Sequence, residues 1–246
     1  MENSTKKKQR RKSDWFYKPV KSKLFAGIII GLMVLSTGCE PSIKVPPSVI
    51  WEPGNSSFIK ETGAKVLGNP TIKKDNIGNA LSFDGIADGL IIDKNPVEGW
   101  SKFTIEALFR PMEDGPKAPR FIHFQDTLGN RGTLEIRVTP QGRWYADTFL
   151  KNGKSDKGLT LIDSTHQHPS NHWYWLALVY DGQKMSHYVN GVKELEGEIE
   201  FNPMRTGKIS IGVRLNEAHW FKGQIREIQF HPVALNHTKL QSIIRK

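Results

Sequence analysis

Apolar and polar residues alternate along three segments of the chain, at residues 103–110, 134–138 and 209–213. A period of two is typical of a β-strand that has one face on a hydrophobic core. Residues 173–180 (WYWLALVY) are apolar on both parities, which predicts a central strand covered on both faces. No segment predicts a long amphipathic helix. The pattern therefore predicts an all-β domain.

Turn-forming pairs of residues separate the predicted strands. Asn, Asp and Gly tolerate the positive φ angles that tight turns require. The pair at 190–191 lies between two strand-like runs, which predicts a β-hairpin. Many short strands with frequent turns are typical of a two-sheet antiparallel sandwich, or jelly roll. The turn-forming pairs are Gly129-Asn130, Asn152-Gly153, Asp181-Gly182 and Asn190-Gly191.

The first 38 residues have the composition of an export signal. A strongly basic segment at 6–12 precedes an apolar stretch at 24–35, and small residues follow it. The apolar stretch is shorter than the roughly 20 residues that a membrane-spanning helix needs. Residues 1–38 are therefore predicted to be a signal peptide that does not belong to the folded domain.

The only cysteine of the chain, Cys39, directly follows this segment. The arrangement resembles the lipobox of bacterial lipoproteins, although Ser36 stands where that family usually has leucine. The resemblance implies lipidation at Cys39 and a bacterial cell envelope location, at the outer rather than the inner membrane. The proline-rich residues 39–48 are expected to be a tether, and residues 49–246 a single domain.

The net charge of +10 suggests a nucleic-acid-binding protein until the charge is divided along the chain. Residues 1–38 hold nine Lys and Arg and two acidic residues, so they carry +7, and residues 39–246 carry +3. A domain this close to neutrality gives no electrostatic reason to expect nucleic acid as a partner.

Five motifs, in order, resemble the laminin-G-like domains of the concanavalin A-like lectin and glucanase superfamily. The resemblance covers nearly all of the predicted domain and implies a jelly roll. It implies little about activity, since this fold carries lectins, adhesion modules, hydrolases and lyases. The motifs lie at 79–92 (NALSFDGIADGLII), 103–107 (FTIEA), 172–182 (HWYWLALVYDG), 188–191 (YVNG) and 221–235 (FKGQIREIQFHPVAL).

The same resemblance implies a possible structural calcium ion at Asp84, Asp88 and Glu227. Arg226 stands where the family often has aspartate, and a cation there opposes a nearby metal ion. The alternative is that the two aspartates stabilise a turn and that Glu227 pairs with an arginine. The alternation is also interrupted here, which predicts a β-bulge near residues 226–227 or a glutamate facing the core.

Two further clusters raise the question of catalysis or metal binding. The alternating glutamates of residues 194–200 have the spacing of paired glycosidase acids, but such a row also occurs on solvated sheet edges. His166, His168 and His172 could hold a metal ion, or could lie in an exposed loop. Neither cluster completes a catalytic motif, so no catalytic residue is assigned.

A third cluster, of polar and aromatic residues, occupies the alternate polar positions of three predicted strands and the two positions of a segment that follows them. If these strands share a sheet, the side chains face one way and could line a sugar-binding groove, with aromatic rings stacking on sugars. Jelly-roll lyases that cleave uronate polymers use a similar set, in which Arg and Gln neutralise the carboxylate. A solvated sheet face is the third alternative. The cluster comprises Glu106, Arg110, His123, Gln125, Glu135, Arg137, Trp144 and Tyr145.

We therefore predict a lipid-anchored envelope protein with a non-catalytic, lectin-like jelly roll. Its expected partners are a polysaccharide or a glycan-bearing surface and, through the lipid, the membrane. A polysaccharide lyase or glycoside hydrolase and a protein–protein adhesion module are the alternatives. The predicted carbohydrate-binding residues are His123, Gln125, Arg137, Trp144 and Tyr145.

Overall fold

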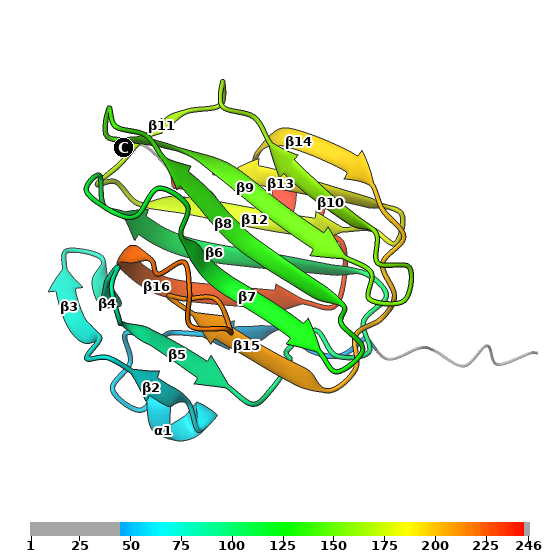
Figure 1. Ribbon diagram of the computed structural model, residues 1–246, viewed down its shortest axis with the longest axis horizontal. Coiled ribbons are helices and arrows are strands. Elements are labelled where there is room, and N and C mark those ends of the chain that lie inside the picture. The colour runs from blue at the N-terminus through cyan, green and yellow to red at the C-terminus, as the bar shows by residue number, and fades with distance from the viewer. Residues whose placement is uncertain (1–44, 244–246) are drawn as a thin grey trace, which may run out of the picture. The chain divides into compact units, whose positions relative to one another are not determined.

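The computed structural model describes residues 45–243, in which two antiparallel β-sheets face each other (Figure 1). This arrangement confirms the predicted all-β, two-sheet sandwich. The predicted signal peptide and Cys39 lie outside the described residues. Between residues 45 and 243, no helix is long and apolar enough to cross a membrane.

Sheet A lies behind sheet B in the view of Figure 1. Its strands run in the order β14-β13-β12-β6-β16-β4-β3, and β1 pairs with β16. The bounds are β1 (Val49–Trp51), β3 (Thr71–Asp75), β4 (Gly78–Asp84), β6 (Phe103–Pro111), β12 (Tyr174–Tyr180), β13 (Lys184–Val189), β14 (Val192–Glu198) and β16 (Lys222–His231).

Sheet B has the order β10-β9-β8-β7-β15-β5-β2, and β11 pairs with β9. Two short helical turns, α1 (Phe58–Thr62) and η1 (His237–Lys239), complete the described elements. The strand bounds are β2 (Lys65–Leu67), β5 (Gly89–Ile92), β7 (Arg120–Asp126), β8 (Arg131–Val138), β9 (Arg143–Lys151), β10 (Gly158–Ile162), β11 (His168–Pro169) and β15 (Gly207–Ile211).

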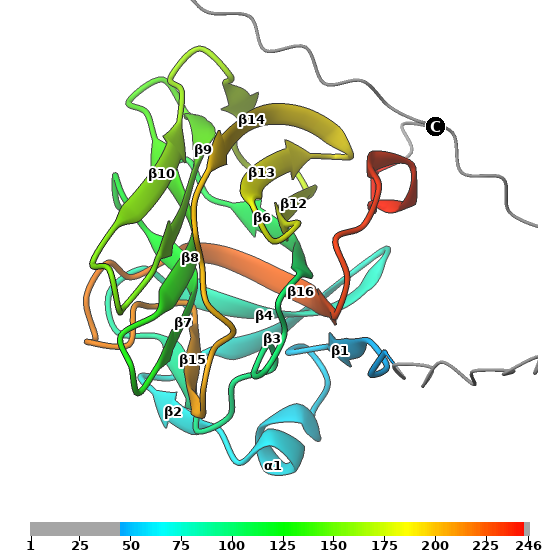
Figure 2. The same ribbon diagram turned by 90° about the vertical axis from the view of Figure 1, so that its right-hand side faces the viewer.

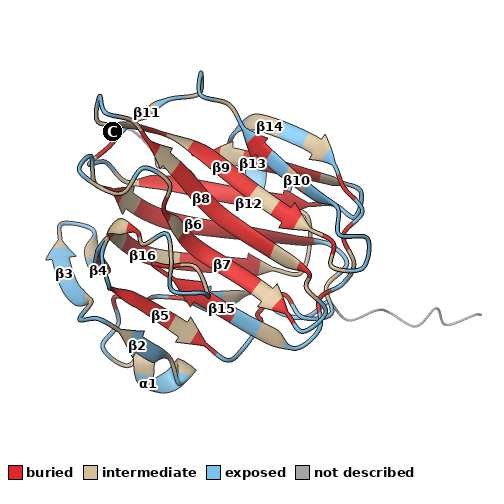
Figure 3. Cartoon of the chain, viewed as in Figure 1, coloured by how far each residue is buried: buried red, intermediate tan, exposed pale blue. Residues whose placement is uncertain are grey.

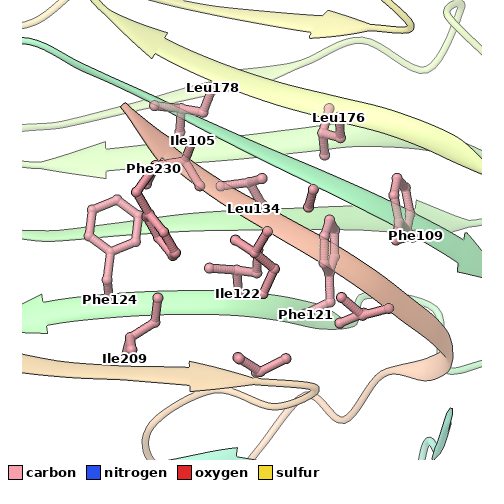
Figure 4. Close-up of a cluster of buried hydrophobic side chains, with 14 of the residues drawn as sticks. Ile105, Phe109, Phe121, Ile122, Phe124, Leu134, Leu176, Leu178, Ile209 and Phe230 are labelled. Carbon is pink, nitrogen blue, oxygen red and sulfur yellow. The ribbon is translucent and has the colours of Figure 1, made fainter. Parts of the chain in front are cut away.

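Aromatic and branched side chains from both sheets fill the space between them (Figure 4). Phe109 of β6 stacks on Phe121 of β7 with ring centroids 4.5 Å apart, and meets Trp144 of β9 edge-on at 5.1 Å. Buried residues dominate the central strands, while β3 and β14 at the edges of sheet A are largely exposed (Figure 3). The core thus fixes which face of each strand points outward.

The strand at residues 174–180 is buried on both faces, as its sequence predicts. On the outer side of sheet A, Ala177 and Val179 pack against Leu240 of the C-terminal segment. The chain after β16 runs along this side of the sheet (Figure 2). This cover explains why β12 has no polar face.

Two local predictions are confirmed by the strand pairing. The hairpin between β13 and β14 turns at Asn190 and Gly191, whose φ angles of 48° and 76° both lie in the left-handed region. The register of β16 on β6 shifts between Ile225 and Glu227, which is the expected bulge. The bulge lets Ile225 and Ile228 both reach the core, where both are fully buried.

Replacing Phe109 with alanine should lower the free energy of unfolding by about 3–5 kcal/mol, because its contacts join the two sheets. Urea-induced unfolding of the purified protein measures this change. Ile86→Ala is the control, since Ile86 is 76 % exposed and its change should stay within about 0.5 kcal/mol. Equal unfolding midpoints for the two variants would contradict this account of the core.

Candidate functional site

Two adjoining cavities lie on the outer face of sheet B, and His123 and Arg214 line both of them. The larger cavity, of about 630 Å³, lies over β7, β15 and the loop after β15. The smaller cavity, of about 160 Å³, lies over β7, β8, β9 and β10. We refer to the two together as the sheet B site.

Strand alternation places His123 in this site. Ile122 and Phe124 on either side of it are fully buried in the core, so the imidazole projects to the opposite face of β7. Gln125, two residues on, projects the same way and lines the larger cavity. A register shift between Arg120 and Ile122 brings Arg120 to the rim of the smaller cavity as well.

The same alternation in β8 and β9 supplies the charged lining of the smaller cavity. Arg120 Nε lies 2.9 Å from Glu135 Oε2, and Arg137 forms an ion pair with Asp147. Glu135 and Asp147 occupy directly opposite positions on β8 and β9. Two arginine–carboxylate pairs therefore lie side by side on the outer face of the sheet.

The loop between β15 and β16 closes the site from above. It folds back over the outer face of sheet B beside β7, and both views show this (Figures 1 and 2). The loop begins at Gly212, whose φ of 80° is left-handed and where a Cβ would lie 2.3 Å from Phe83. Only glycine satisfies both conditions. The backbone N–H of Leu215 then donates a 3.1 Å hydrogen bond to Nδ1 of His123.

This hydrogen bond defines the tautomer of His123. Because Nδ1 accepts a hydrogen bond, the neutral imidazole carries its proton on Nε2. Nε2 is buried and has no hydrogen-bond partner among residues 45–243. Burial, together with the positive charges of Arg214 and Arg131, lowers the pKa of His123 to about 3. The ring is therefore a neutral donor throughout the physiological pH range.

Asp147 has an unusual protonation equilibrium within the site. Burial and the nearby charge of Glu135 raise its pKa to about 6, against the opposing influence of Arg137. Its negative charge is consequently lost on mild acidification, which leaves the smaller cavity more positive.

The structure brings together only part of the predicted carbohydrate-binding set. His123 and Gln125 line the larger cavity, and His123 and Arg137 line the smaller one. Tyr145 pairs with Arg137 across β8 and β9 and shares its face, but lines neither cavity. The prediction for Trp144 is wrong, because its side chain is fully buried between the sheets and cannot stack on a sugar.

Glu106 and Arg110 were expected on the same face only if their strand shared a sheet with the others, and that condition is not met. Both belong to β6, which lies in sheet A, whereas the other residues lie in sheet B. Glu106 accepts a 2.7 Å hydrogen bond from the backbone N–H of Gln241, and Arg110 donates a 2.9 Å bond to the carbonyl of Asn171. Their roles are to hold neighbouring segments.

The acids of the expected calcium site stabilise a turn instead. Oδ1 of Asp84 accepts hydrogen bonds from three successive backbone N–H groups, and Asp88 accepts from Asp84 and Asn69. Glu227 accepts from Gln229, and among residues 45–243 it forms no ion pair with an arginine. In residues 45–243 no three His, Cys, Asp or Glu side chains form a group that could hold a metal ion. These residues therefore do not fit the oxygen cage that calcium needs.

The glutamate run of β14 is not a uniformly solvated edge, because Glu194 and Glu196 have different surroundings. Glu194 is nearly buried and bonds to Nε2 of His168 at 2.7 Å, with Nε2 of His187 at 3.6 Å. Burial opposes ionisation, but the two histidines lower the pKa of Glu194 to about 2. Glu196 instead pairs with exposed lysines. The predicted metal pair His166 and His168 thus lies beside a structural carboxylate.

The sequence interpretation missed four charged residues of the smaller cavity, Arg120, Arg131, Asp147 and Arg214. Arg131 lies on the same face of β8 as Arg137, and Asp147 lies on the same face of β9 as Tyr145. The alternation of side chains along these strands could therefore have identified both residues. Arg120 lies at a bulge, which breaks the alternation. Arg214 comes from the loop after β15, and no local pattern brings that loop over β7.

The comparison with protein families identifies the chain. The sequence profile of the concanavalin A-like lectin/glucanases superfamily matches residues 84–241. The chain belongs to this superfamily. A search of curated proteins finds no sequence that matches this chain.

Solved structures share the fold of this superfamily member at low identity. Domain 4 of AbnA, an extracellular arabinanase from Geobacillus stearothermophilus solved with arabinotriose, has 15 % identity and a TM-score of 0.51, covering 81 % of this chain and 88 % of its own. The binding domain of botulinum neurotoxin serotype D has 15 % identity and a TM-score of 0.56, covering 77 % of this chain. This chain spans about half, 49 %, of that neurotoxin domain.

The imidazole of His123 should not titrate between pH 7.5 and 5, because burial and three arginines disfavour its charged form. NMR of ¹⁵N-labelled protein measures this directly, and the nitrogen shifts should report a neutral ring protonated on Nε2. The His123→Gln variant assigns the signal. A midpoint near the usual value of about 6.5 would contradict the described geometry.

Proposed function

We propose that this protein is a non-catalytic carbohydrate-binding module whose ligand lies in the sheet B site. The observation that carries the proposal is the pair of adjoining cavities that share His123, with its buried and unpartnered Nε2–H donor. Leaving such a donor unsatisfied costs about 1–3 kcal/mol. A ligand oxygen would remove that cost.

The larger cavity suits a sugar by size and by lining. Its volume of about 630 Å³ falls within the roughly 300–1,000 Å³ of small-molecule sites. Ile91 and Leu215 offer apolar contacts for a sugar ring, while Gln125 and Asn216 offer hydrogen bonds to hydroxyl groups. A mixed lining of this kind suits the alternating apolar and hydroxyl-bearing surfaces of a carbohydrate.

The comparisons support a sugar ligand at a coarse level. The arabinanase domain that shares this fold has been solved with arabinotriose, and it matches over most of both chains. At 15 % identity this likeness extends to the fold alone, so the ligand is inferred from the site.

Binding is favoured over the lyase alternative by the state of His123. A lyase base needs a free lone pair, yet Nδ1 already accepts the N–H of Leu215 and Nε2 carries the proton. Tyr145, the other residue of the predicted set whose side chain could transfer a proton, lines neither cavity. Neither His123 nor Tyr145 is therefore placed in the sheet B site as a proton acceptor, whereas His123 can donate to a ligand.

Gln125→Ala should weaken binding to the recognised polysaccharide roughly fivefold, because one hydrogen bond to a hydroxyl contributes about 1 kcal/mol. Native affinity gels with neutral and acidic polysaccharides first identify the polymer and then compare variants. Gln224→Ala, on β16 of sheet A, is the matched control and should bind as the wild type.

The polymer should keep its length throughout these incubations, since the module is proposed to be non-catalytic. Retardation by no polymer at all would overturn the proposal in favour of a protein–protein adhesion module. Shortened polymer with unsaturated ends would favour the lyase.

We further propose that the protein is exported and anchored by lipid at Cys39. The basic and apolar leader and the single cysteine after it support this location. Because one acyl chain binds a membrane only marginally, a stable anchor requires more than one. Intact-mass spectrometry of protein from bacterial membranes should find an acylated N-terminal Cys39, and Cys39→Ser should lack the acyl mass. Unmodified wild-type protein would contradict the anchor.

A further inference from the structure

Two arginines at the sheet B site have no carboxylate partner. Of the four that line the smaller cavity, Arg120 and Arg137 form ion pairs, whereas Arg131 and Arg214 form none with any residue between 45 and 243. The guanidinium carbon of Arg131 lies 5.1 Å from the ring centroid of Phe149, which holds it over the aromatic face. Four cations against two carboxylates leave an excess of two positive charges.

His123, which carries an unsatisfied donor, lines the same cavity. Its side chain is 1 % exposed, and Nε2–H has no partner among the described residues. Three residues whose side-chain donors have no acceptor between residues 45 and 243, namely His123, Arg131 and Arg214, therefore line one small space. Guanidinium groups present paired N–H donors that match the two oxygens of a carboxylate.

We propose that the smaller cavity binds the anionic substituent of an acidic sugar, such as the carboxylate of a uronate residue. Arg131 and Arg214 provide the charge, and His123 donates a neutral hydrogen bond to the same group. The inference rests on the proposed function, since the remainder of the glycan would occupy the larger cavity. His123 and Arg214 line both cavities and so connect the two parts of the ligand.

The size of the smaller cavity agrees with this division. Its volume of about 160 Å³ is that of roughly five water molecules. This space accommodates a charged substituent and part of its ring, whereas an oligosaccharide needs the larger cavity. A neutral sugar would leave both unpaired guanidinium groups without compensation, so charge distinguishes acidic from neutral glycans here.

Neutralisation of Asp147 should strengthen the anion site. The ion pair of Asp147 with Arg137 contributes one of the two negative charges facing the cavity, and that charge is lost as the pH falls through about 6. A uronate carboxylate remains ionised there, with an expected pKa of about 3.5. Acidic polymers should therefore bind more tightly at pH 5.5 than at pH 7.5.

The test compares matched polymers that differ only in charge. The purified full chain is titrated by calorimetry with polygalacturonate, alginate and hyaluronan, and with each polymer after reduction of its carboxyl groups to alcohols. Dextran sulfate and dextran form the corresponding pair for sulfate. The expected result is binding of a carboxylate polymer that falls tenfold or more on reduction.

Substitutions then test which residues provide the positive charge that binds the acidic polymer. Replacing Arg131 and Arg214 together with glutamine should weaken acidic-polymer binding roughly a hundredfold and remove most of its salt dependence. Because neither guanidinium pairs with a carboxylate, the unfolding midpoint in urea should remain near that of the wild type. Arg143→Gln is the matched control, since Arg143 lies on β9 and donates to the carbonyl of Gln167 away from both cavities.

Each outcome has a distinct meaning. Equal binding of native and reduced polymers, or unchanged binding by the double variant, would overturn the anion site and leave the glycan-binding proposal intact. Binding of dextran sulfate alone would assign the cavity to sulfate rather than carboxylate. Binding of neither acidic nor neutral polymers would overturn both the inference and the proposed function.

Discussion

The packing of aromatic side chains between the two sheets is the interaction on which the rest of the structure depends. Phe109 and Phe121 come from opposite sheets and stack at 4.5 Å, with Trp144 against them. Since side chains alternate across a strand, fixing these residues inward fixes their neighbours outward. A shift of β9 by one residue would exchange Trp144 with Tyr145 and move Asp147 into the core. The register imposed by the core therefore also defines the charged site.

The site combines a rigid floor with a loop that determines its chemistry. Strands β7, β8 and β9 supply His123, Arg137 and Asp147 from backbone that is hydrogen-bonded along its length. The loop after β15 adds Arg214 and, through the N–H of Leu215, sets the tautomer of His123. One backbone hydrogen bond thus turns an imidazole that could act as a base into a donor.

The predictions from sequence succeeded where the cause was local. The turn at Asn190 and Gly191 follows from the backbone preferences of these two residues. The bulge before Glu227 follows from the interrupted alternation of apolar and polar residues there. The assignment of Trp144 to a sugar groove was wrong because the sequence did not fix the first and last residues of that strand. A shift by one residue moves a side chain to the opposite face of the sheet. The grouping of Glu106 with His123 failed for a different reason. Alternation identifies the face of a strand but gives no information on which sheet the strand joins.

The sequence by itself determined the all-β class, the superfamily and four residues of the predicted cluster that line the site: His123, Gln125, Glu135 and Arg137. These properties depend on periodicity, turn chemistry and motifs within a few residues of one another. Only the tertiary structure decided that β6 lies opposite β7, that Trp144 is core, and that Arg214 reaches His123. Those features depend on strand order and on a loop that joins distant segments. They are set by packing between separate strands and loops, such as the contact of Leu215 with His123 across 92 positions, which no local pattern encodes.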